Sequence, residues 1–395
     1  MPSDKEHLFF DRLAQTTDSP FGLYLEKAEG SYIWDTEGKK YLDFVAGIAV
    51  ANVGHRHPTV VQAIETQLKK YLHTMVYGEY IQDIQVDLAE KLARILPSNL
   101  DCTYLVNSGT EANEAALKLA KRHTGRTKLV AFKKSYHGST HGSLSVSGNE
   151  EKKYAFRPLL PDVRFLEFNN IEDLKQIDSS VAAVIIEVIQ GDAGVRIAEK
   201  SFLTALRKTC DENGVLLIMD EIQSGMGRTG KMFSFEHYDV FPDILTLAKG
   251  FGGGLPIGAM ISKKSIMSDF THNPPLGHIT TFGGNPLSCA AAGAVIDVIL
   301  AENLCKKAVE KGSLITSLLL HSKIKALRQI GLMIAVDLEN ENELSQLIAY
   351  CKEHGVIIYR FLSHPFSFRI SPPLNMSDYD IKTGVNIILE GLDQL

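Results

Sequence analysis

The sequence has 395 residues, of which 45% are hydrophobic, enough for a large domain and a smaller one in a single globular unit. Lys and Arg total 41 against 47 Asp and Glu, and a net charge of -6 offers no basic surface for nucleic acid. The five cysteines show no C-x-x-C spacing, which argues against a disulfide framework or a zinc ribbon. The N-terminus is polar and the apolar runs are too short to span a membrane, so we expect an unprocessed cytoplasmic protein.

Residues 1–50 are expected to contribute to the smaller domain. Within them, residues 23–45 alternate apolar and polar positions around turn signals, which predicts antiparallel strands built on Tyr32, Trp34 and Tyr41. A helix is predicted after Pro58, because apolar residues then recur every four positions and proline fits the first turn of a helix.

Residues 51–285 are expected to form the larger domain. From about residue 100, short apolar runs alternate with helical patterns, and these runs are the predicted strands: 103–106, 129–132, 181–186, 215–219, 244–247 and 257–261. Strands that alternate with helices predict an α/β fold with a mainly parallel sheet covered by helices on both faces. Residues 286–395 are expected to form the smaller α+β domain, with strands at 333–336, 356–359 and 368–370 and a last helix.

Lys249 stands between an apolar run and a glycine-rich loop, and Asp220 ends another apolar run upstream. A lysine attacks an aldehyde when its surroundings lower its pKa from about 10.4 toward neutrality. Pyridoxal 5′-phosphate (PLP) supplies such an aldehyde, and its pyridine nitrogen needs a carboxylate to stay protonated. The two residues therefore predict a PLP site, although a lysine after a strand is more often a solvated strand end.

Ser108, Gly109 and Thr110 lie between a predicted strand and a predicted helix, at the helix N-terminus. Free N–H groups and the helix dipole favour a phosphate there, and the two hydroxyls can add hydrogen bonds. Plain N-capping by Ser108 or Thr110, with Glu111 in the first turn, explains the same residues equally well.

Tyr136 follows the strand predicted at 129–132, where ligands of open α/β sheets collect and where an aromatic ring can stack on a flat ligand. A buried tyrosine that anchors a loop is the alternative. His137 and His141 have the spacing of ligands on a helix, but neither has a cysteine or an acidic third ligand nearby in the sequence. We therefore expect no metal site.

Gly225, Gly227 and Gly230 satisfy the pattern G-x-G-x-x-G. This fingerprint binds a dinucleotide only where it opens a long helix. The residues after Gly230 lack the periodicity of a long amphipathic helix, so we expect no nucleotide site there.

With these motifs in this order, the chain resembles the class III aminotransferases of PLP fold type I, a family that includes acetylornithine, ornithine and 4-aminobutyrate aminotransferases and many ω-transaminases. The resemblance covers nearly the whole chain, from the Gly30-Ser-Tyr-Ile-Trp-Asp segment to the Phe368-Arg-Ile-Ser-Pro-Pro-Leu segment. It implies that the protein moves an amino group, in most cases a terminal or ω-amino group, from an amine or amino acid to a 2-oxo acid by a ping-pong mechanism.

The resemblance also implies a role for each matched residue. Lys249 would form the Schiff base with PLP and then serve as the base that moves the substrate proton. Asp220 would pair with the pyridinium nitrogen, and Gln223 would donate to the phenolic oxygen. Ile222 and Tyr136 would pack on the two faces of the ring.

The phosphate of PLP would be held by Ser108, Gly109 and Thr110. Thr281 would reach the same phosphate from a partner subunit. The resemblance therefore implies a homodimer whose two subunits share each active site.

Arg369 sits where the family places the arginine that binds the carboxylate of the 2-oxo acid, and Glu187 sits where a glutamate masks that arginine while the ω-amine reacts. An arginine suits this task because its planar fork binds a carboxylate through two parallel hydrogen bonds. Asp192 and the alanine after it replace a common glutamate-glycine pair, which we expect to alter the shape of the loop more than its chemistry.

Ser139 is a departure from the acetylornithine and ornithine enzymes, which have an arginine there that grips a substrate carboxylate. Arg157 or Arg360 would have to compensate for it. The identity of the amine donor therefore cannot be inferred from position 139.

Two other functions stay open. A PLP isomerase of the same fold, an amino-acid epimerase or an aminomutase, would use the same lysine and aspartate. The Glu187 and Arg369 pair favours transfer, because alternation between two substrates is what a switchable arginine serves. The intact set of Lys249, Asp220 and Gln223 argues against a catalytically silent binding protein.

Overall fold

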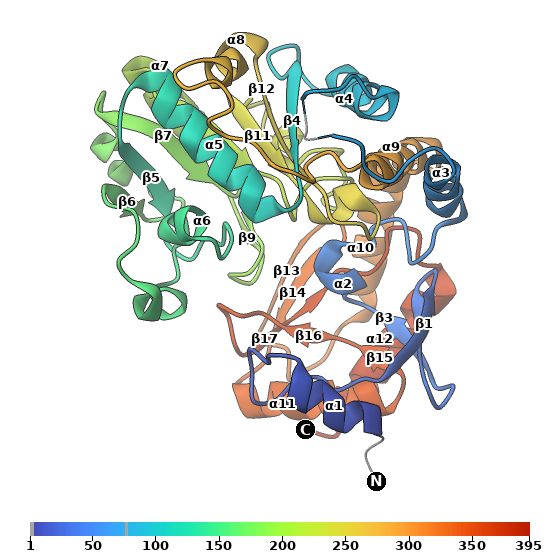
Figure 1. Ribbon diagram of the computed structural model, residues 1–395. Coiled ribbons are helices and arrows are strands. Elements are labelled where there is room, and N and C mark those ends of the chain that lie inside the picture. Colours follow the sequence, from blue (N-terminus) through green and yellow to red (C-terminus); the bar gives the residue numbers. More distant parts are fainter. Residues whose placement is uncertain (1–3, 76–77) are drawn as a thin grey trace.

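The computed structural model describes residues 4–75 and 78–395, and Figure 1 shows two lobes built on separate sheets. Residues 1–3, where the expected polar N-terminus begins, lie outside the described residues, as do residues 76–77. In the described part no single helix is long and apolar enough to cross a membrane, and α9 (Pro286–Ala301) with α10 (Leu304–Leu318) meets that criterion only as a pair bent by 67°.

The larger lobe centres on a seven-stranded sheet with the order β4-β12-β11-β10-β7-β5-β6. β12 runs antiparallel to β11 and β4, whereas the other neighbouring pairs are parallel. The predicted α/β fold with a mainly parallel sheet is confirmed, while β6 and the reversed direction of β12 were not predicted. The strands are β4 (Cys102–Val106), β5 (Lys128–Phe132), β6 (Val163–Leu166), β7 (Val181–Ile186), β10 (Leu216–Asp220), β11 (Ile244–Leu247) and β12 (Gly258–Ser262).

Both faces of this sheet are buried, which explains why its strands are continuously apolar. Leu129 and Ala131 of β5 point into one hydrophobic cluster, and Val130 and Phe132 point into the other. α5 (Gly109–Thr124) crosses the first face (Figure 1), and its buried face is rich in alanine, so the helix approaches the strands closely. α7 (Lys200–Asn213) supplies large apolar side chains, such as Phe202, to the cluster on the second face.

The smaller lobe contains two four-stranded sheets, ordered β13-β14-β17-β16 and β1-β2-β3-β15. The single strand predicted at 356–359 is divided between them, because β15 pairs with β3 while β16 pairs with β17. Buried Ile358 lies where the chain passes from one sheet to the other. The strands are β1 (Leu25–Glu29), β2 (Tyr32–Asp35), β3 (Lys40–Asp43), β13 (Ala326–Ile330), β14 (Met333–Asp337), β15 (Val356–Ile357), β16 (Tyr359–Arg360) and β17 (Ser367–Ile370).

The pairing of β3 with β15 brings the first part of the chain into a sheet with residues near its end. α9 (Pro286–Ala301), where the smaller domain was expected to begin, packs against α3 (Pro58–Leu68) and α4 (Asp83–Ile95). Helix α3 begins at the predicted proline, and the His57 side chain caps it by accepting from Thr59 N. The C-terminal helices are α10 (Leu304–Leu318), α11 (Glu341–Glu353) and α12 (Asp378–Asp393).

Short elements connect these layers. The short helices are α1 (Asp4–Arg12), α2 (Ala46–Ala49), α6 (His141–Val146) and α8 (Lys264–Met267). The two-residue strands β8 (Ile189–Gln190) and β9 (Arg196–Ile197) form a separate pair. The 3-10 helices are η1 (Glu150–Lys152), η2 (Tyr154–Phe156), η3 (Glu172–Gln176), η4 (Ser234–His237), η5 (Lys249–Gly252) and η6 (Ser268–Thr271).

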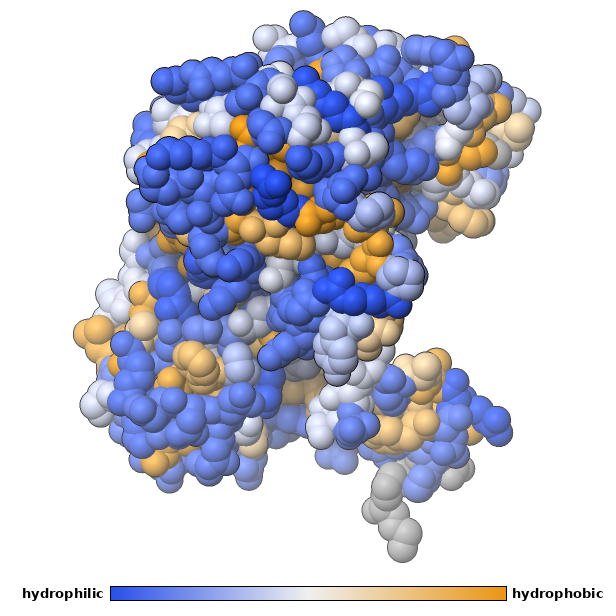
Figure 2. All heavy atoms as spheres, turned by 90° about the vertical axis from the view of Figure 1, so that its left-hand side faces the viewer, coloured by the Kyte–Doolittle hydropathy of each residue, from blue (hydrophilic) through white to orange (hydrophobic). Residues whose placement is uncertain are grey.

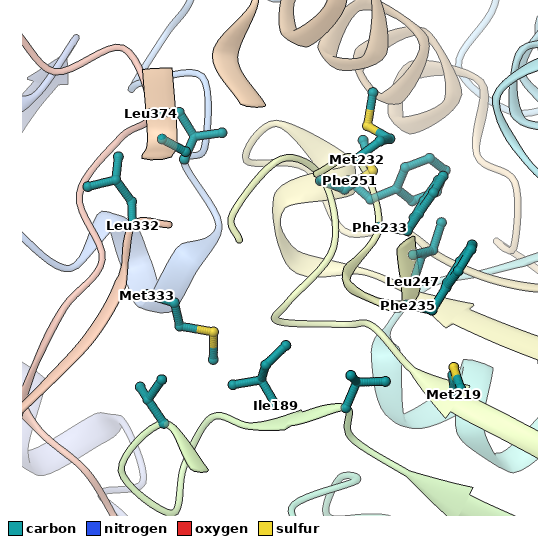
Figure 3. Close-up of a cluster of buried hydrophobic side chains, with 14 of the residues drawn as sticks. Ile189, Met219, Met232, Phe233, Phe235, Leu247, Phe251, Leu332, Met333 and Leu374 are labelled. Atoms are coloured by element: carbon teal, nitrogen blue, oxygen red, sulfur yellow. The ribbon is translucent and has the colours of Figure 1, made fainter. Parts of the chain in front are cut away.

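The two lobes share one hydrophobic interior. Figure 3 shows Met219 and Leu247, from strands of the large sheet, and Leu332 and Leu374, from the smaller lobe, in the same buried cluster. Arg228 ties the lobes together by donating to the carbonyls of Leu332 and Pro372 at 3.0 and 2.6 Å. The space between the lobes is therefore held in a fixed shape.

Candidate active site

A cavity of about 640 Å³ lies where the strands of the large sheet end, and residues of the smaller lobe complete its wall. This is the place where open α/β sheets bind ligands. All the residues predicted from the sequence except Thr281 line it: Ser108, Gly109, Thr110, Tyr136, Glu187, Asp220, Ile222, Gln223, Lys249 and Arg369. Residues up to 261 positions apart, from Ser108 to Arg369, thus meet around one space.

Asp220, the last residue of β10, is buried and held in one orientation. Its Oδ2 accepts from Asn113 Nδ2 and lies 2.8 Å from His137 Nδ1, and its Oδ1 accepts from Ile222 N at 3.0 Å. Asn113 is itself fixed, because its Oδ1 accepts from Thr246 Oγ1 at 2.8 Å. Asp220 is therefore a buried carboxylate positioned by neighbours on α5, in the loop after β5 and in the turn after β10.

Sequence reasoning missed two of these neighbours. Asn113 is the polar residue on the alanine-rich, fully buried face of α5, and a buried amide needs a partner, so its position was a usable signal. His137 was weighed only as a metal ligand. In the structure the His137 imidazole instead contacts Asp220 Oδ2. Among residues 4–75 and 78–395, no group of His, Cys, Asp and Glu could hold a metal ion.

Lys249 begins η5, directly after the apolar strand β11, and lies largely buried in the cavity wall. Its backbone φ of 46° is in the left-handed region, which is uncommon for a lysine and is typical of functional sites. Burial lowers the pKa of Lys249, while the carboxylates of Asp220 and Glu187 oppose that shift. A lysine with a lowered pKa has the neutral amine that a nucleophile needs.

The N-terminus of α5 forms a narrow cradle beside Lys249. Ser108 is the N-cap, and its Oγ accepts from Glu111 N at 3.3 Å, so the capping role weighed from the sequence is present. A Cβ added to Gly109 would lie 2.7 Å from Ile222 Cδ1, so a larger residue there would require the Ile222 side chain to shift. The free N–H groups and the positive end of the dipole of this helix lie at the cavity, where they favour an anion.

Glu187 contacts the loop that carries Tyr136. Its Oε2 accepts from Tyr136 N at 2.8 Å and its Oε1 from Gly191 N at 3.3 Å. Burial raises the pKa of Glu187 to about 7, and the nearby Asp220 carboxylate adds to that shift, whereas His137 opposes it. Tyr136 lines the cavity and is 40% exposed, so a ligand can reach its side chain.

Arg369, on β17, is buried, and its Nη2 lies 3.3 Å from Asp192 Oδ1. No ion pair joins Glu187 to Arg369 among residues 4–75 and 78–395 of this structure, and their pairing while an ω-amine reacts stays a prediction. The two backbone N–H groups already described hold Glu187 in another direction. Asp192 keeps the carboxylate of the glutamate that it replaces, and this carboxylate faces the arginine. The expectation that the replacement alters the shape of the loop more than its chemistry stays a prediction.

Thr281 is exposed and is not among the residues that line the cavity of its own chain. The side chain of its neighbour Thr280 contacts the same subunit, because Thr280 Oγ1 accepts from Asn107 Nδ2 at 2.9 Å. After Gly230 the chain forms the four-residue 3-10 helix η4. It does not form the long helix that a dinucleotide-binding glycine loop opens.

The family model described as "Aminotransferase class-III" matches residues 13–392. The chain belongs to the class III aminotransferases. An acetylornithine aminotransferase of Methanopyrus kandleri is 44% identical over 334 residues, which are 84% of this chain and 85% of the relative. A LysW-aminoadipate semialdehyde/glutamate semialdehyde transaminase of Sulfolobus acidocaldarius is 39% identical over 376 residues, which are 94% and 95% of the two chains.

The fold agrees with this assignment. The crystal structure of an ornithine aminotransferase from Toxoplasma gondii matches with a TM-score of 0.91 and 29% identity, covering 98% of this chain and 95% of that one. The predicted PLP fold type I is confirmed, and this class III aminotransferase is a PLP-dependent transferase. The relatives are named as aminotransferases, and they give no support to the epimerase or aminomutase alternative.

The residues present fit PLP. The cavity combines a largely buried amine, a buried carboxylate held by hydrogen bonds and a helix N-terminus at which Gly109 lies close to Ile222. These are the groups that an aldehyde, a pyridinium and a phosphate require.

Proposed function

We propose that this aminotransferase transfers a terminal (ω) amino group from an amine or amino acid to a 2-oxo acid in the cavity around Lys249. The observation that carries the proposal is the presence of a lysine with a lowered pKa and a fixed buried carboxylate in one cavity at the strand ends. When bound, PLP supplies an aldehyde for the amine and a pyridinium that stabilises a carbanion.

Each cavity residue then has a task. Lys249 Nζ would bond the cofactor aldehyde and, once released by the substrate amine, would move the proton between the substrate carbon that bears the amine and C4′ of the cofactor. Asp220 keeps a proton on the ring nitrogen, and Asn113 and His137 keep its carboxylate pointed there. Gln223 donates to the phenolic oxygen of the cofactor.

The remaining residues contact the two faces of the cofactor ring and the phosphate. Ile222 and Tyr136 pack on the two ring faces, and this fits the 40% exposure of Tyr136 in the cavity. Ser108, Gly109 and Thr110 bind the phosphate at the N-terminus of α5, with the helix dipole adding to the backbone N–H groups.

The residues that would contact the substrate are Arg369, Asp192 and Glu187. Arg369 binds the carboxylate of the 2-oxo acid, and Asp192 neutralises the arginine while no carboxylate is bound. Glu187 lies nearer to Tyr136 and Lys249, where its pKa of about 7 lets it exchange a proton near neutral pH. The relatives named for acetylornithine and for LysW-aminoadipate semialdehyde support a donor that reacts through a terminal amine.

The proposal includes a homodimer in the cytoplasm. Thr281 is exposed beside Phe282, which is 58% exposed, and both fit a surface that a second subunit covers. Helix α1 projects from the body (Figure 2) and exposes apolar side chains, with Phe10 56% and Leu13 60% exposed at its end. Apolar side chains gathered in this way are typical of an interface.

A matrix of amine donors and 2-oxo acids tests the proposal. The holoenzyme is incubated with each pair, and the swapped products are measured by mass spectrometry, with Lys249→Ala as the control. We expect products from donors with a terminal amine and from 2-oxoglutarate or pyruvate. Turnover of α-amino acids alone, or interconversion of one amino acid without a 2-oxo acid, would contradict it.

A further inference from the structure

Arg228 is a fully buried cation where the two lobes meet. Its Nη1 donates to the carbonyls of Leu332 and Pro372, and its Nη2 donates to Asn52 Oδ1 at 2.6 Å. These three acceptors are neutral, and burial lowers the pKa of Arg228 to about 9, so the charge is costly to keep inside the protein. An apolar side chain would join the lobes at less cost. The arginine instead supplies a planar fork that fixes its partners in one geometry.

Asn52, the side-chain partner of this arginine, lies against the segment that carries Lys249. Asn52 is 1% exposed, and its Nδ2 donates to Met226 O at 2.9 Å in the turn after β10. A Cβ added to Gly250 would lie 2.4 Å from Asn52 Nδ2, so the backbone directly after Lys249 packs on this amide. The amide therefore contacts the two chain segments that follow β10 and β11, the strands before the cofactor residues.

The backbone contacts of Arg228 reach the strand that carries Arg369. Pro372, whose carbonyl oxygen lies 2.6 Å from Arg228 Nη1, is three residues after Arg369. Leu332 comes directly before β14, and β14 pairs with β17 so that Ala335 lies opposite Arg369. Leu332 N also donates to Arg228 O at 3.0 Å. Arg228 is thus bonded to the end of β17 and to the strand beside it.

Two side chains therefore connect the lysine segment to the arginine strand. The path runs from the backbone after Lys249 through Asn52 and Arg228 to the end of β17, and each step is a hydrogen bond or a close contact. A 2-oxo acid needs both ends of this path, because its carbonyl reacts near Lys249 while its carboxylate pairs with Arg369. An amine without a carboxylate needs the lysine alone.

We propose that Arg228 and Asn52 are positioning residues that fix the separation between Lys249 and Arg369. This inference rests on the proposed function, because it takes Arg369 as the residue that binds the acceptor carboxylate. Neither Arg228 nor Asn52 lines the cavity around Lys249, so both act through the segments that they hold. Their loss slows the acceptor half-reaction more than the donor half-reaction.

Arg228→Lys tests this in the holoenzyme, because lysine keeps the charge but has no planar fork. In stopped flow, the pyridoxamine phosphate form is mixed with 2-oxoglutarate, and the PLP form is mixed with pentylamine. We expect the saturating rate with 2-oxoglutarate to fall about tenfold or more, since a displacement of about 1 Å can cost about 10²-fold. The rate with pentylamine should stay within about twofold of the wild-type rate.

Glutarate distinguishes a displaced arginine from a lost one. It has the carboxylates of 2-oxoglutarate but no carbonyl to react, and it is titrated calorimetrically into the holoenzyme. We expect its dissociation constant to change little in Arg228→Lys and to rise severalfold in Arg369→Gln. A severalfold rise in both variants would show that Arg228 maintains the carboxylate pocket itself, which would contradict a role in setting the separation.

Arg126→Lys is the matched control. Arg126 Nη1 also donates to three backbone carbonyls, at the opposite ends of the strands: those of Val181, Asn213 and Gly214. This variant should lose thermal stability as Arg228→Lys does, yet leave the rates of both half-reactions at the wild-type values. A selective loss with 2-oxoglutarate in Arg126→Lys would mean that reduced stability alone explains the effect.

Asn52→Ala breaks the same path at its other end and carries the test if Arg228→Lys does not fold. It should show the same selective loss with 2-oxoglutarate. Equal losses in the two half-reactions, or no loss in either, would overturn the positioning role while the proposed function stands. If the wild type reacts with neither substrate, or if Arg369→Gln reacts with 2-oxoglutarate as fast as the wild type, the proposed function fails and the positioning role fails with it.

Discussion

Asp192 Oδ1 lies 3.3 Å from Arg369 Nη2, and this ion pair joins the turn after β8 to strand β17 across the substrate side of the cavity. Burial lowers the pKa of Arg369, and the Asp192 carboxylate opposes that shift. In the proposed function, an arriving 2-oxo acid competes with Asp192 for the arginine. The same aspartate accepts hydrogen bonds from Leu362 N and Ser363 Oγ.

Arg369→Ala should damage the acceptor half-reaction most. Loss of one partner of a buried charged pair costs roughly 2 to 5 kcal/mol, and the carboxylate of the 2-oxo acid loses its cation. The donor half-reaction with a simple amine should suffer much less, because that substrate has no carboxylate for Arg369. Stopped-flow measurement of the two half-reactions checks this, and equal losses in both half-reactions for Arg369→Ala would contradict the assignment.

Asp192→Ala is the matched variant. It should leave Arg369 unneutralised and shift the donor preference toward α-amino acids.

Glu187→Gln should flatten the dependence of stability on pH. Burial raises the pKa of Glu187 to about 7 from 4.5, so the folded protein binds this proton more tightly than the unfolded chain does. The contribution of Glu187 to the free energy of unfolding therefore falls as the pH rises from about 4.5 to 7. Urea unfolding of the apoenzyme at several pH values measures the slope. Glu221, whose pKa burial also raises to about 7, stays titratable and should leave part of the slope in the variant.

Asp220→Asn should keep the fold and slow the single-turnover rate by about 10²-fold or more, since a neutral amide does not hold a proton on the ring nitrogen. The carbonyl oxygen of the new amide can still accept from one of the two neighbours at Oδ2, so cofactor binding should survive. His137→Leu should give a smaller loss in the same assay, because Asn113 still orients the carboxylate. A near-wild-type rate in Asp220→Asn would remove this residue from the mechanism.

The sequence predicted the cofactor side of the site better than the substrate side. Asp220 ends a strand, and Lys249 and Ser108 each lie two residues after one, so their positions at the strand ends depend on local order along the chain. The partner of Arg369 depends instead on how β17 of the smaller lobe packs against the turn after β8, a contact between residues 177 positions apart. No periodicity encodes which of two nearby carboxylates meets the arginine.

The same distinction holds in the fold. The central strands β5, β7, β10 and β11 were predictable because apolar runs bounded by turns leave little choice of structure. β6, with residues such as Arg164 at the sheet edge, has no such run and was missed. The strand predicted at 356–359 was divided because two separate sheets compete for its backbone groups, which only the packed structure decides.

Lys249→Ala should lose the visible absorbance of the holoenzyme and all transamination, because the amine that bonds the cofactor is gone. The burial that lowers the pKa of Lys249 also predicts reaction with added PLP at a lower pH than an ordinary surface lysine requires. Borohydride reduction followed by peptide mass spectrometry should find the cofactor on Lys249 in the wild type. A reducible adduct in the variant would show that another lysine carries the cofactor.

Thr281 should contribute to the site of the other subunit, and hybrid dimers decide this. Thr281→Ala alone should weaken PLP binding, because it removes a hydroxyl from the phosphate, and bound PLP should stabilise the dimer by linkage.

Thr281→Ala is then mixed with Lys249→Ala and the hybrid dimer is isolated. If each site takes Lys249 from one subunit and Thr281 from the other, the hybrid has one complete site and recovers about half of the wild-type activity. If each chain supplies its own Thr281, neither site is complete and the hybrid gains nothing over Thr281→Ala. Light scattering on the same samples confirms the dimer, and full activity in a monomer would exclude a shared site.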